Sequence, residues 1–250
     1  MIIKLLLSEL IHKNNYSLNK DKVLSSLRKN GYYFLPDFMK PAEIKEALND
    51  FNKAYFENKK NITLESNGSD RRIYGIERKT NFTNDLLIDY STLVNRKFSF
   101  SSNNNFILSG WIKSSENNTG SGNGWHRDSP FRHQFKSILY LVDVNKNNGP
   151  FEYIPESHTF KNLLKISKHS GQTNSEFRFN HSTIKSLTQK KILKKSKVFT
   201  SKAGSLILVD TRGLHRGRPL IEGERKALTT YFLSKEKEKK FLWQAKIKKN

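Results

Sequence analysis

The stretch Trp125-His126-Arg127-Asp128 ends a run rich in Gly, Ser and Asn and opens an apolar segment. Side chains alternate along an extended backbone, so His126 and Asp128 point to the same side of the chain. An imidazole and a carboxylate on one side are two of the three ligands of a facial two-histidine, one-carboxylate site for ferrous iron. The third ligand must then be a histidine from a distant part of the sequence.

A second apolar run supplies a suitable histidine. Residues 206–209 are Leu-Ile-Leu-Val, His215 follows them, and Arg225 stands ten positions later. A guanidinium is a fixed cation that can hold a carboxylate through two hydrogen bonds. The order His126, Asp128, His215 and Arg225 makes an oxygenase the leading interpretation. His-x-Asp alone occurs by chance in many proteins, and a surface His beside a turn-forming Asp is the plain alternative.

Composition indicates a globular chain without cysteine. The 250 residues show no internal repeat and fit one large domain with a sizeable core. Hydrophobic residues make up 35% and aromatic residues 12%, which excludes a disordered class of protein. Because the chain has no Cys, disulfides and thiolate metal sites are excluded, and any metal must be held by His, Asp or Glu.

The first residues do not resemble a membrane span or an export signal. Residues 1–11 are apolar, but Lys4 and Glu9 interrupt them and the segment is too short to cross a bilayer. No small-residue cleavage site follows, so secretion is not expected. We therefore predict a cytoplasmic protein with no membrane partner.

The net charge of +22 has two interpretations. Lysines are spread along the whole chain and are denser in 190–197 and 234–250. A solvated basic surface explains this distribution without any partner. The alternative is attraction to a polyanion or to an acidic substrate. We expect a small-molecule substrate and no nucleic-acid partner, and the sequence leaves the oligomeric state open.

Hydrophobic spacing predicts helices in the first part of the chain and strands in the second. The predicted helices cover 21–30, 41–55 and 85–96, with a helical insertion over 163–195. The predicted strands are 32–35, 106–112, 137–144, 151–154, 198–200, 205–209 and 227–234. We expect 151–154 to pair with 137–144 across the turn at 147–150. Residues 59–79 and 114–124 are predicted loops, the first with strand pieces near 73–74. This order indicates a β-sandwich or barrel with N-terminal helices packed outside it.

Several motifs taken together resemble one known family. They are Gly124 to Asp128; Ser137 to Val144; Asn148-Gly149-Pro150 running to Ile154-Pro155-Glu156-Ser157-His158; Ala203 to Asp210 before His215; and Asn30-Gly31-Tyr32 with Met39 to Ile44. In this combination the chain is similar to the phytanoyl-CoA dioxygenase family over about residues 20–235. Each motif alone is weak, and the combination is specific.

The resemblance implies a mainly β, α+β fold of the double-stranded β-helix (jelly-roll, cupin-like) type and the use of Fe(II), 2-oxoglutarate and O2. It implies that His126, Asp128 and His215 are the catalytic iron ligands and that Arg225 binds the distal carboxylate of 2-oxoglutarate. Related halogenases have a small residue in place of the carboxylate, so Asp128 favours hydroxylation. The chain departs from the family at Glu156, where Gly is common, and at Gly217, where some members have a Ser that touches the co-substrate.

Further residues are weaker candidates. Lys113 matches a position where family members place a polar contact to 2-oxoglutarate, and an ordinary surface lysine is the alternative. Substrate contacts are proposed for four residues that flank the His-x-Asp motif: Trp125, Arg127, Phe131 and Arg132. For the two aromatic ones, core packing is the alternative. His158 is expected to form a hydrogen bond within its turn and support the barrel.

We therefore predict a single-domain dioxygenase, with a core over about 20–235 and a basic tail at 235–250. It would hydroxylate a small organic substrate while 2-oxoglutarate is decarboxylated to succinate, and the positive charge hints at an acidic substrate. One rival is a non-catalytic basic module on a cupin-like scaffold that binds nucleic acid or an anionic glycan. A second rival is a cupin-like protein that uses another metal without 2-oxoglutarate, and it predicts that replacing Arg225 leaves activity unchanged.

Overall fold

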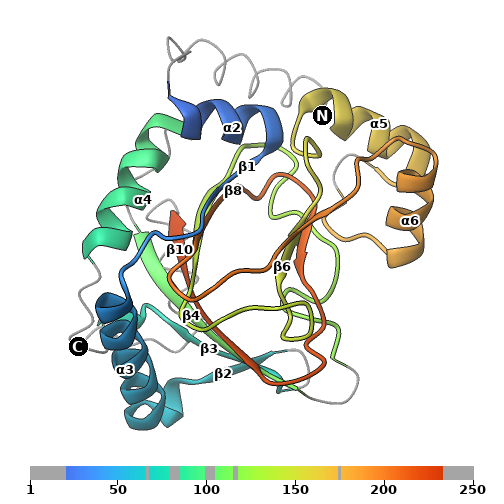
Figure 1. Cartoon of the computed structure of the whole chain (residues 1–250). Helices are drawn as coiled ribbons and strands as arrows, with labels where there is room; N and C mark the ends of the chain where they lie inside the picture. The colour runs from blue at the N-terminus through green and yellow to red at the C-terminus, as the bar shows by residue number, and fades with distance from the viewer. Residues whose placement is uncertain are drawn as a thin grey trace.

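Two antiparallel sheets form the centre of the molecule in a computed structural model that describes residues 21–65, 68–78, 85–98, 105–114, 118–173 and 176–232. The strands are β1 Tyr32–Leu35, β2 Thr63–Glu65, β3 Asp70–Tyr74, β4 Asn105–Lys113, β5 Phe135–Tyr140, β6 Phe151–Tyr153, β7 Lys197–Phe199, β8 Leu206–Asp210, β9 His215–Gly217 and β10 Glu224–Phe232. The large sheet has the order β1-β8-β5-β10-β4-β3-β2, and the small sheet has the order β7-β6-β9 (Figure 1). This arrangement agrees with the predicted jelly roll.

Strand β8 is apolar from Leu206 to Val209 because both of its faces are covered, and all five of its residues, Asp210 included, are buried. Leu206 and Leu208 belong to the core on the helical side of the large sheet. Ile207 and Val209 belong to a second core, which they share with residues of the small sheet. Because side chains alternate along a strand, β8 contributes two apolar side chains to each of the two cores.

Helices α2 Lys22–Asn30, α3 Pro41–Glu57 and α4 Asp85–Phe98 lie along the outer side of the large sheet (Figure 1). Their ends differ from the predicted ones by at most two residues, so the three predicted helices are confirmed. The Asp21 side chain caps the start of α2, and Gly31, in a left-handed conformation, ends it. His158 donates a hydrogen bond of 2.8 Å to the Arg28 carbonyl of α2 rather than within its own turn. It therefore supports the sheet–helix junction.

The predicted helical insertion forms two helices, α5 Phe160–Ser170 and α6 His181–Gln189, beyond the small sheet (Figure 1). Ile166, Ile184 and Leu187 of these helices pack in one cluster with Trp125. The predicted loop over 59–79 contains short elements, η1 Lys59–Asn61, η2 Ile76–Arg78 and strands β2 and β3. In the described parts of the chain, no helix is long and apolar enough to cross a membrane. The predicted basic tail, 235–250, lies outside the described residues.

The predicted pairing of 151–154 with 137–144 is wrong. Strand β5 ends at Tyr140, and β6 pairs instead with β7 and β9 of the small sheet. The intervening residues carry the chain from one sheet to the other, so two strands that are close in sequence lie in different layers. The Phe151 backbone N–H donates to the Tyr140 hydroxyl across this gap, at 2.9 Å.

A buried hydrogen-bond network around Asp210 joins β8 to the segment before β5. The Asp210 side chain is inaccessible to solvent and accepts hydrogen bonds from His133 Nδ1 and from the backbone N–H of Gln134 and Arg212. Arg212 in turn donates to His133 Nε2 at 2.8 Å. Burial raises the pKa of the Asp210 carboxyl, but His133 and the other donors outweigh burial and hold that pKa well below its ordinary value.

We expect Asp210→Asn to lower the free energy of unfolding by about 1.5 to 3 kcal/mol, since it weakens hydrogen bonds that His133 and two backbone N–H groups donate to a buried charged carboxylate. Because the folded pKa of Asp210 is lowered, its contribution is present above the unfolded carboxyl pKa of about 4 and is lost as pH falls. Urea unfolding at pH 7 and at about pH 2 measures both effects. A variant as stable as the wild type, or one with the wild-type acid dependence, would contradict this account.

Candidate active site

Three ligand-type side chains from distant parts of the sequence meet at one end of the space between the sheets. Ligand atoms of His126, Asp128 and His215 all lie within 4.8 Å of one another. The Asp128 Oδ1 atom is 3.9 Å from His126 Nε2 and 4.0 Å from His215 Nε2. His126 and His215 form an antiparallel bridge, with backbone N–H to carbonyl distances of 3.0 and 2.8 Å. This pairing places both imidazoles on the same side of the backbone.

Both imidazoles are held in the form that binds a metal through Nε2. The Nδ1–H of His126 donates to the Gly124 carbonyl and that of His215 to the Gly213 carbonyl, each at 2.9 Å. Burial lowers the pKa of His126, and burial followed by the nearby His126 lowers the pKa of His215 to about 3. The rings are therefore neutral at pH 7, with a free lone pair on each Nε2.

Lys136 on β5 fixes the orientation of the carboxylate. Its ammonium is buried, lies 2.5 Å from Asp128 Oδ2 and sits 4.0 Å from the centre of the Tyr231 ring. Burial raises the pKa of the Asp128 carboxyl, but Lys136 and the two histidines outweigh burial and hold that pKa well below its ordinary value. Asp128 is therefore an anion, with Oδ2 held by Lys136 and Oδ1 near the histidines.

We expect Lys136→Met to weaken Fe(II) binding by about 10- to 100-fold, because the group that orients a metal-binding carboxylate is lost. An anaerobic titration against a chromophoric chelator measures the affinity. The control is Lys202→Met, which removes an exposed lysine paired with Asp143 on the surface. Unchanged iron affinity in Lys136→Met would show that Asp128 is positioned without it.

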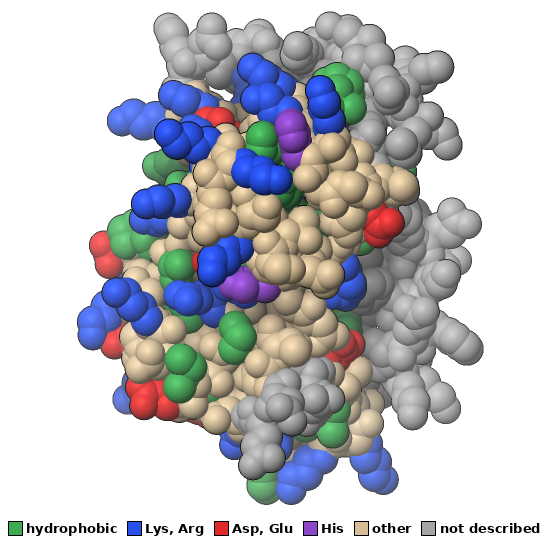
Figure 2. Space-filling view, turned by 90° about the vertical axis from the view of Figure 1, so that its right-hand side faces the viewer, with side chains coloured by type: hydrophobic (Ala, Val, Ile, Leu, Met, Phe, Trp, Pro, Cys, Tyr) green, Lys and Arg blue, Asp and Glu red, His purple; other side chains and the backbone are tan. Residues whose placement is uncertain are grey.

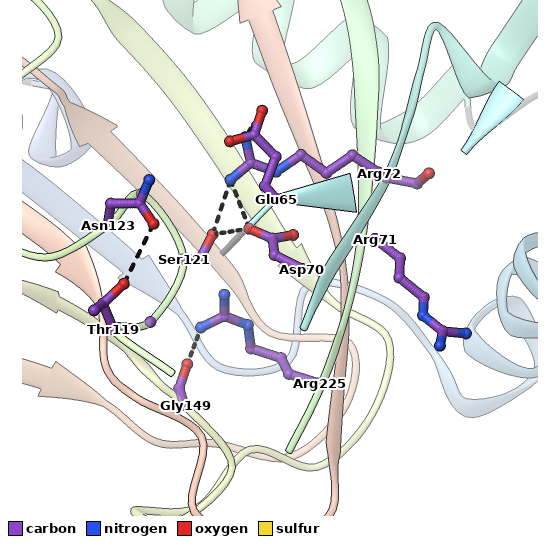
Figure 3. Close-up of polar contacts among 12 residues, drawn as sticks. Glu65, Asp70, Arg71, Arg72, Thr119, Ser121, Asn123, Gly149 and Arg225 are labelled. Atoms are coloured by element: carbon purple, nitrogen blue, oxygen red, sulfur yellow. Dashed lines mark hydrogen bonds and ion pairs between the residues drawn. The ribbon is translucent and has the colours of Figure 1, made fainter. Parts of the chain in front are cut away.

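The three side chains line a cavity of about 330 Å³ that extends to Arg225 on β10. Arg225 is buried, and one of its nitrogens donates to the carbonyl of Gly149 (Figure 3). Burial lowers the pKa of Arg225. In the described part of the chain no carboxylate lies within ion-pairing distance of this guanidinium, and its Nε has no hydrogen-bond partner. A buried cation of this kind requires an anion, which a ligand in the cavity can supply.

Lys113 does not face this cavity, so the predicted contact to 2-oxoglutarate has no support in the structure. Gly110 and Ile112 of β4 line the cavity. Because side chains alternate along a strand, Trp111 and Lys113 face the other way. The Lys113 ammonium lies 4.1 Å from the centre of the Trp111 ring.

The four residues predicted to touch substrate also lie outside the residues that line the cavity. Trp125 and Arg127 alternate with His126 and Asp128, so they point to the opposite side and are buried there. Arg127 lies over the Phe179 ring and Arg216 over the Trp125 ring. Phe131 is half-buried and Arg132 exposed, in the segment that follows the motif. Trp125 and Arg127 therefore pack behind the site, and the predicted substrate contacts of all four residues have no support in the structure.

Polar residues that the sequence interpretation missed line the cavity instead. Asp70 on β3 is buried, and its Oδ2 accepts from Arg72 Nη2 at 2.6 Å and from Ser121 Oγ at 2.9 Å (Figure 3). Arg178, which follows α5, lines the cavity as well. Asp70, Arg72 and Ser121 lie in stretches that were predicted as loops, and Arg178 lies in the predicted helical insertion. The charged run Asp70-Arg71-Arg72 hides the strand, because it lacks the alternation of apolar and polar residues that predicts one.

The comparison with known families decides the identity of this site. The family model described as phytanoyl-CoA dioxygenase (PhyH) matches residues 27–227. The chain belongs to the phytanoyl-CoA dioxygenase family. The protein is therefore a dioxygenase of the class that depends on Fe(II) and 2-oxoglutarate, and its donor set of two imidazoles and a carboxylate fits ferrous iron. No curated protein matches the chain significantly.

Solved structures show that the dioxygenase shares its fold with 2-oxoglutarate-dependent enzymes. The carbocyclase SnoK from nogalamycin biosynthesis has a TM-score of 0.61 at 13% identity, over 86% of this chain and 84% of that one. HygX from Streptomyces hygroscopicus with nickel, 2-oxoglutarate and hygromycin B bound has 0.53 at 12%, over 86% and 88%. EctD from S. alaskensis with bound Fe has 0.56 at 17%, over 85% and 76%. At these identities the likeness shows the fold alone.

Proposed function

We propose that His126, Asp128 and His215 hold ferrous iron, that Arg225 binds the distal carboxylate of 2-oxoglutarate, and that the enzyme hydroxylates a small organic molecule. The observation that carries this proposal is one cavity that is lined both by a donor set of two neutral imidazoles and a carboxylate and by a buried cation. The Arg225 guanidinium has no carboxylate partner among the described residues, so a carboxylate of the co-substrate would supply the missing anion.

The chain's own residues have separable tasks. Lys136 keeps Asp128 ionised and oriented, and the carbonyls of Gly124 and Gly213 keep both histidines in the metal-binding tautomer. The Gly149 carbonyl accepts a hydrogen bond from the Arg225 guanidinium and holds it in the cavity wall. Bound iron, with 2-oxoglutarate and O2, supplies the oxidising power that removes hydrogen from a C–H bond, and 2-oxoglutarate leaves as succinate and CO2.

Asp128 supports hydroxylation over halogenation. His126, Asp128 and His215 would together supply three ligands to a bound iron, and the Asp128 carboxylate would occupy the place that a halide needs. The apolar part of the cavity wall, which includes Leu108, Ile112 and Ile138, keeps bulk water away from the reacting centre. A small-molecule substrate agrees with the cavity volume of about 330 Å³.

The test is succinate formation by anaerobically iron-loaded protein supplied with 2-oxoglutarate and then O2. Uncoupled turnover in the absence of substrate is sufficient, and candidate substrates are added afterwards as accelerators. Succinate that requires both iron and O2 supports the proposal. Protein that binds neither iron nor 2-oxoglutarate, and binds polyanions with a steep salt dependence, would replace it with the basic binding module.

A further inference from the structure

Arg178 stands directly beside the proposed iron ligands, although it comes from the insertion after α5. The Arg127 backbone N–H donates to the Phe177 carbonyl at 2.8 Å, and that of Phe179 donates to the Trp125 carbonyl at 2.9 Å. His126 is thus bridged to His215 on one side and to Arg178 on the other. Residues paired across an antiparallel bridge project to the same face, and Arg178 accordingly lines the cavity.

The Arg178 guanidinium is held at the cavity rim before any ligand arrives. Its Nη1 donates to the carbonyls of Gly122 and Asn123, at 2.7 and 3.3 Å. Gly122 has a φ of +83°, and a Cβ on it would lie 2.3 Å from the His126 ring, so this loop sits against the site with no space to shift inward. The remaining nitrogens of Arg178 have no hydrogen-bond partner within the described residues, and the side chain is exposed at the rim.

Two of the other cations that line the cavity, Lys136 and Arg225, already have partners in the proposed function. Lys136 pairs with Asp128 at 2.5 Å. Arg225 is reserved for the distal carboxylate of the co-substrate in the proposed function. The two positive charges of ferrous iron equal the two negative charges of 2-oxoglutarate, so binding both leaves the net charge of the cavity unchanged.

The third cation, Arg72, has an acidic partner on its own strand. It pairs with Asp70 at 2.6 Å and lies 3.8 Å from Glu65 (Figure 3). Arg178 is the cation left over: across the described ranges, no carboxylate pairs with it. Lys and Arg side chains also outnumber acidic ones on the face of the molecule that carries α5 and α6 (Figure 2).

We propose that Arg178 binds an anionic group of the primary substrate, which makes that substrate a small organic acid. This inference rests on the proposed function and deepens it. A carboxylate and a phosphate monoester offer the same chemistry to a guanidinium, two oxygen acceptors and a negative charge. The anion sits at the rim beside Arg178, and the rest of the molecule extends inward toward the iron ligands.

The experiment compares acids with neutral molecules of the same shape. Full-length protein is loaded anaerobically with Fe(II) and 2-oxoglutarate, and calorimetry measures binding of benzoate against benzamide, hexanoate against hexanamide, and phenyl phosphate against phenol. We expect at least one acid to bind about tenfold or more tightly than its neutral counterpart. The pair that shows the preference distinguishes a carboxylate from a phosphate substrate.

Variants then assign that preference to one side chain. Arg178→Gln should reduce the ratio of acid to neutral affinity to near one, while Arg178→Lys, which keeps the charge, should retain most of it. Lys202→Gln removes a surface cation away from the cavity and should leave the ratio unchanged. Because the ratio is taken within one variant, a general loosening of the loop at Gly122 does not mimic the effect.

Two results would overturn the inference: no acid in the panel binding better than its neutral counterpart, or Arg178→Gln keeping the wild-type ratio. Binding of 2-oxoglutarate is measured in the same samples. If 2-oxoglutarate binds and the acids show no preference, this inference alone is wrong. If 2-oxoglutarate does not bind, the proposed function itself has failed.

Discussion

His215→Ala abolishes detectable Fe(II) binding at micromolar metal and lowers 2-oxoglutarate turnover by about a thousandfold or more. Loss of an outer group that orients a ligand costs about 10- to 100-fold in metal affinity, and loss of the ligand itself costs more. The structure supplies no replacement, since the described residues contain no other group of His, Asp and Glu placed to hold a metal. Two ligands that remain cannot enforce facial geometry.

Asp128→Ala should give the same result. Because Asp128 and His215 lie in different parts of the fold, misfolding of one variant would not explain a loss of iron binding in both. Circular dichroism and thermal melting check that each variant is folded. His181→Ala, which removes an exposed histidine at the start of α6, is the matched control and should bind iron as the wild type does. Iron binding that survives in both His215→Ala and Asp128→Ala would place the metal elsewhere.

Arg225→Ala raises the dissociation constant for 2-oxoglutarate by about 100-fold, while Fe(II) binding is retained. Truncating one partner of a buried charge pair costs about 2 to 5 kcal/mol, and 1.4 kcal/mol is a factor of ten. Arg225→Lys should fall between the wild type and Arg225→Ala, because an ammonium keeps the charge but loses the two-pronged geometry. Calorimetry on iron-loaded protein measures all three constants.

Lys113→Ala is the control for this series, since Lys113 lies on the neighbouring strand β4 and faces the Trp111 ring away from the cavity. We expect its affinity for 2-oxoglutarate to be the same as that of the wild type. An effect of Lys113→Ala comparable to that of Arg225→Ala would restore the original sequence prediction. Unchanged turnover in Arg225→Ala at low 2-oxoglutarate would favour a cupin-like protein that does not use this co-substrate.

Local patterns predicted most of the fold because they are properties of short segments. Helix periodicity located α2, and the apolar run of β8 marked a strand covered on both sides. The pairing of β6 was not predictable from its neighbours, since it depends on the chain crossing between sheets after Tyr140. Strands that are close in sequence usually pair as a hairpin, but in this jelly roll the two strands belong to different sheets.

The proposed iron ligands were predictable because their spacing reflects strand alternation, and the same rule explains the errors. Alternation places His126 and Asp128 on one face and therefore excludes Trp125 and Arg127 from it, which the sequence interpretation overlooked. Lys136 was missed because the predicted strand began at residue 137, whereas β5 begins at Phe135. The position of Arg178 could not be predicted from the sequence, because it lies beside His126 through a backbone bridge between segments more than fifty residues apart.

The most direct measurement of the central claim is an anaerobic calorimetric titration of 2-oxoglutarate into the protein with and without Fe(II). The account predicts one 2-oxoglutarate per chain in the presence of iron, much weaker binding without iron, and loss of binding in both His215→Ala and Arg225→Ala. Binding of 2-oxoglutarate that is independent of iron and of both residues, or no binding at all, would contradict it.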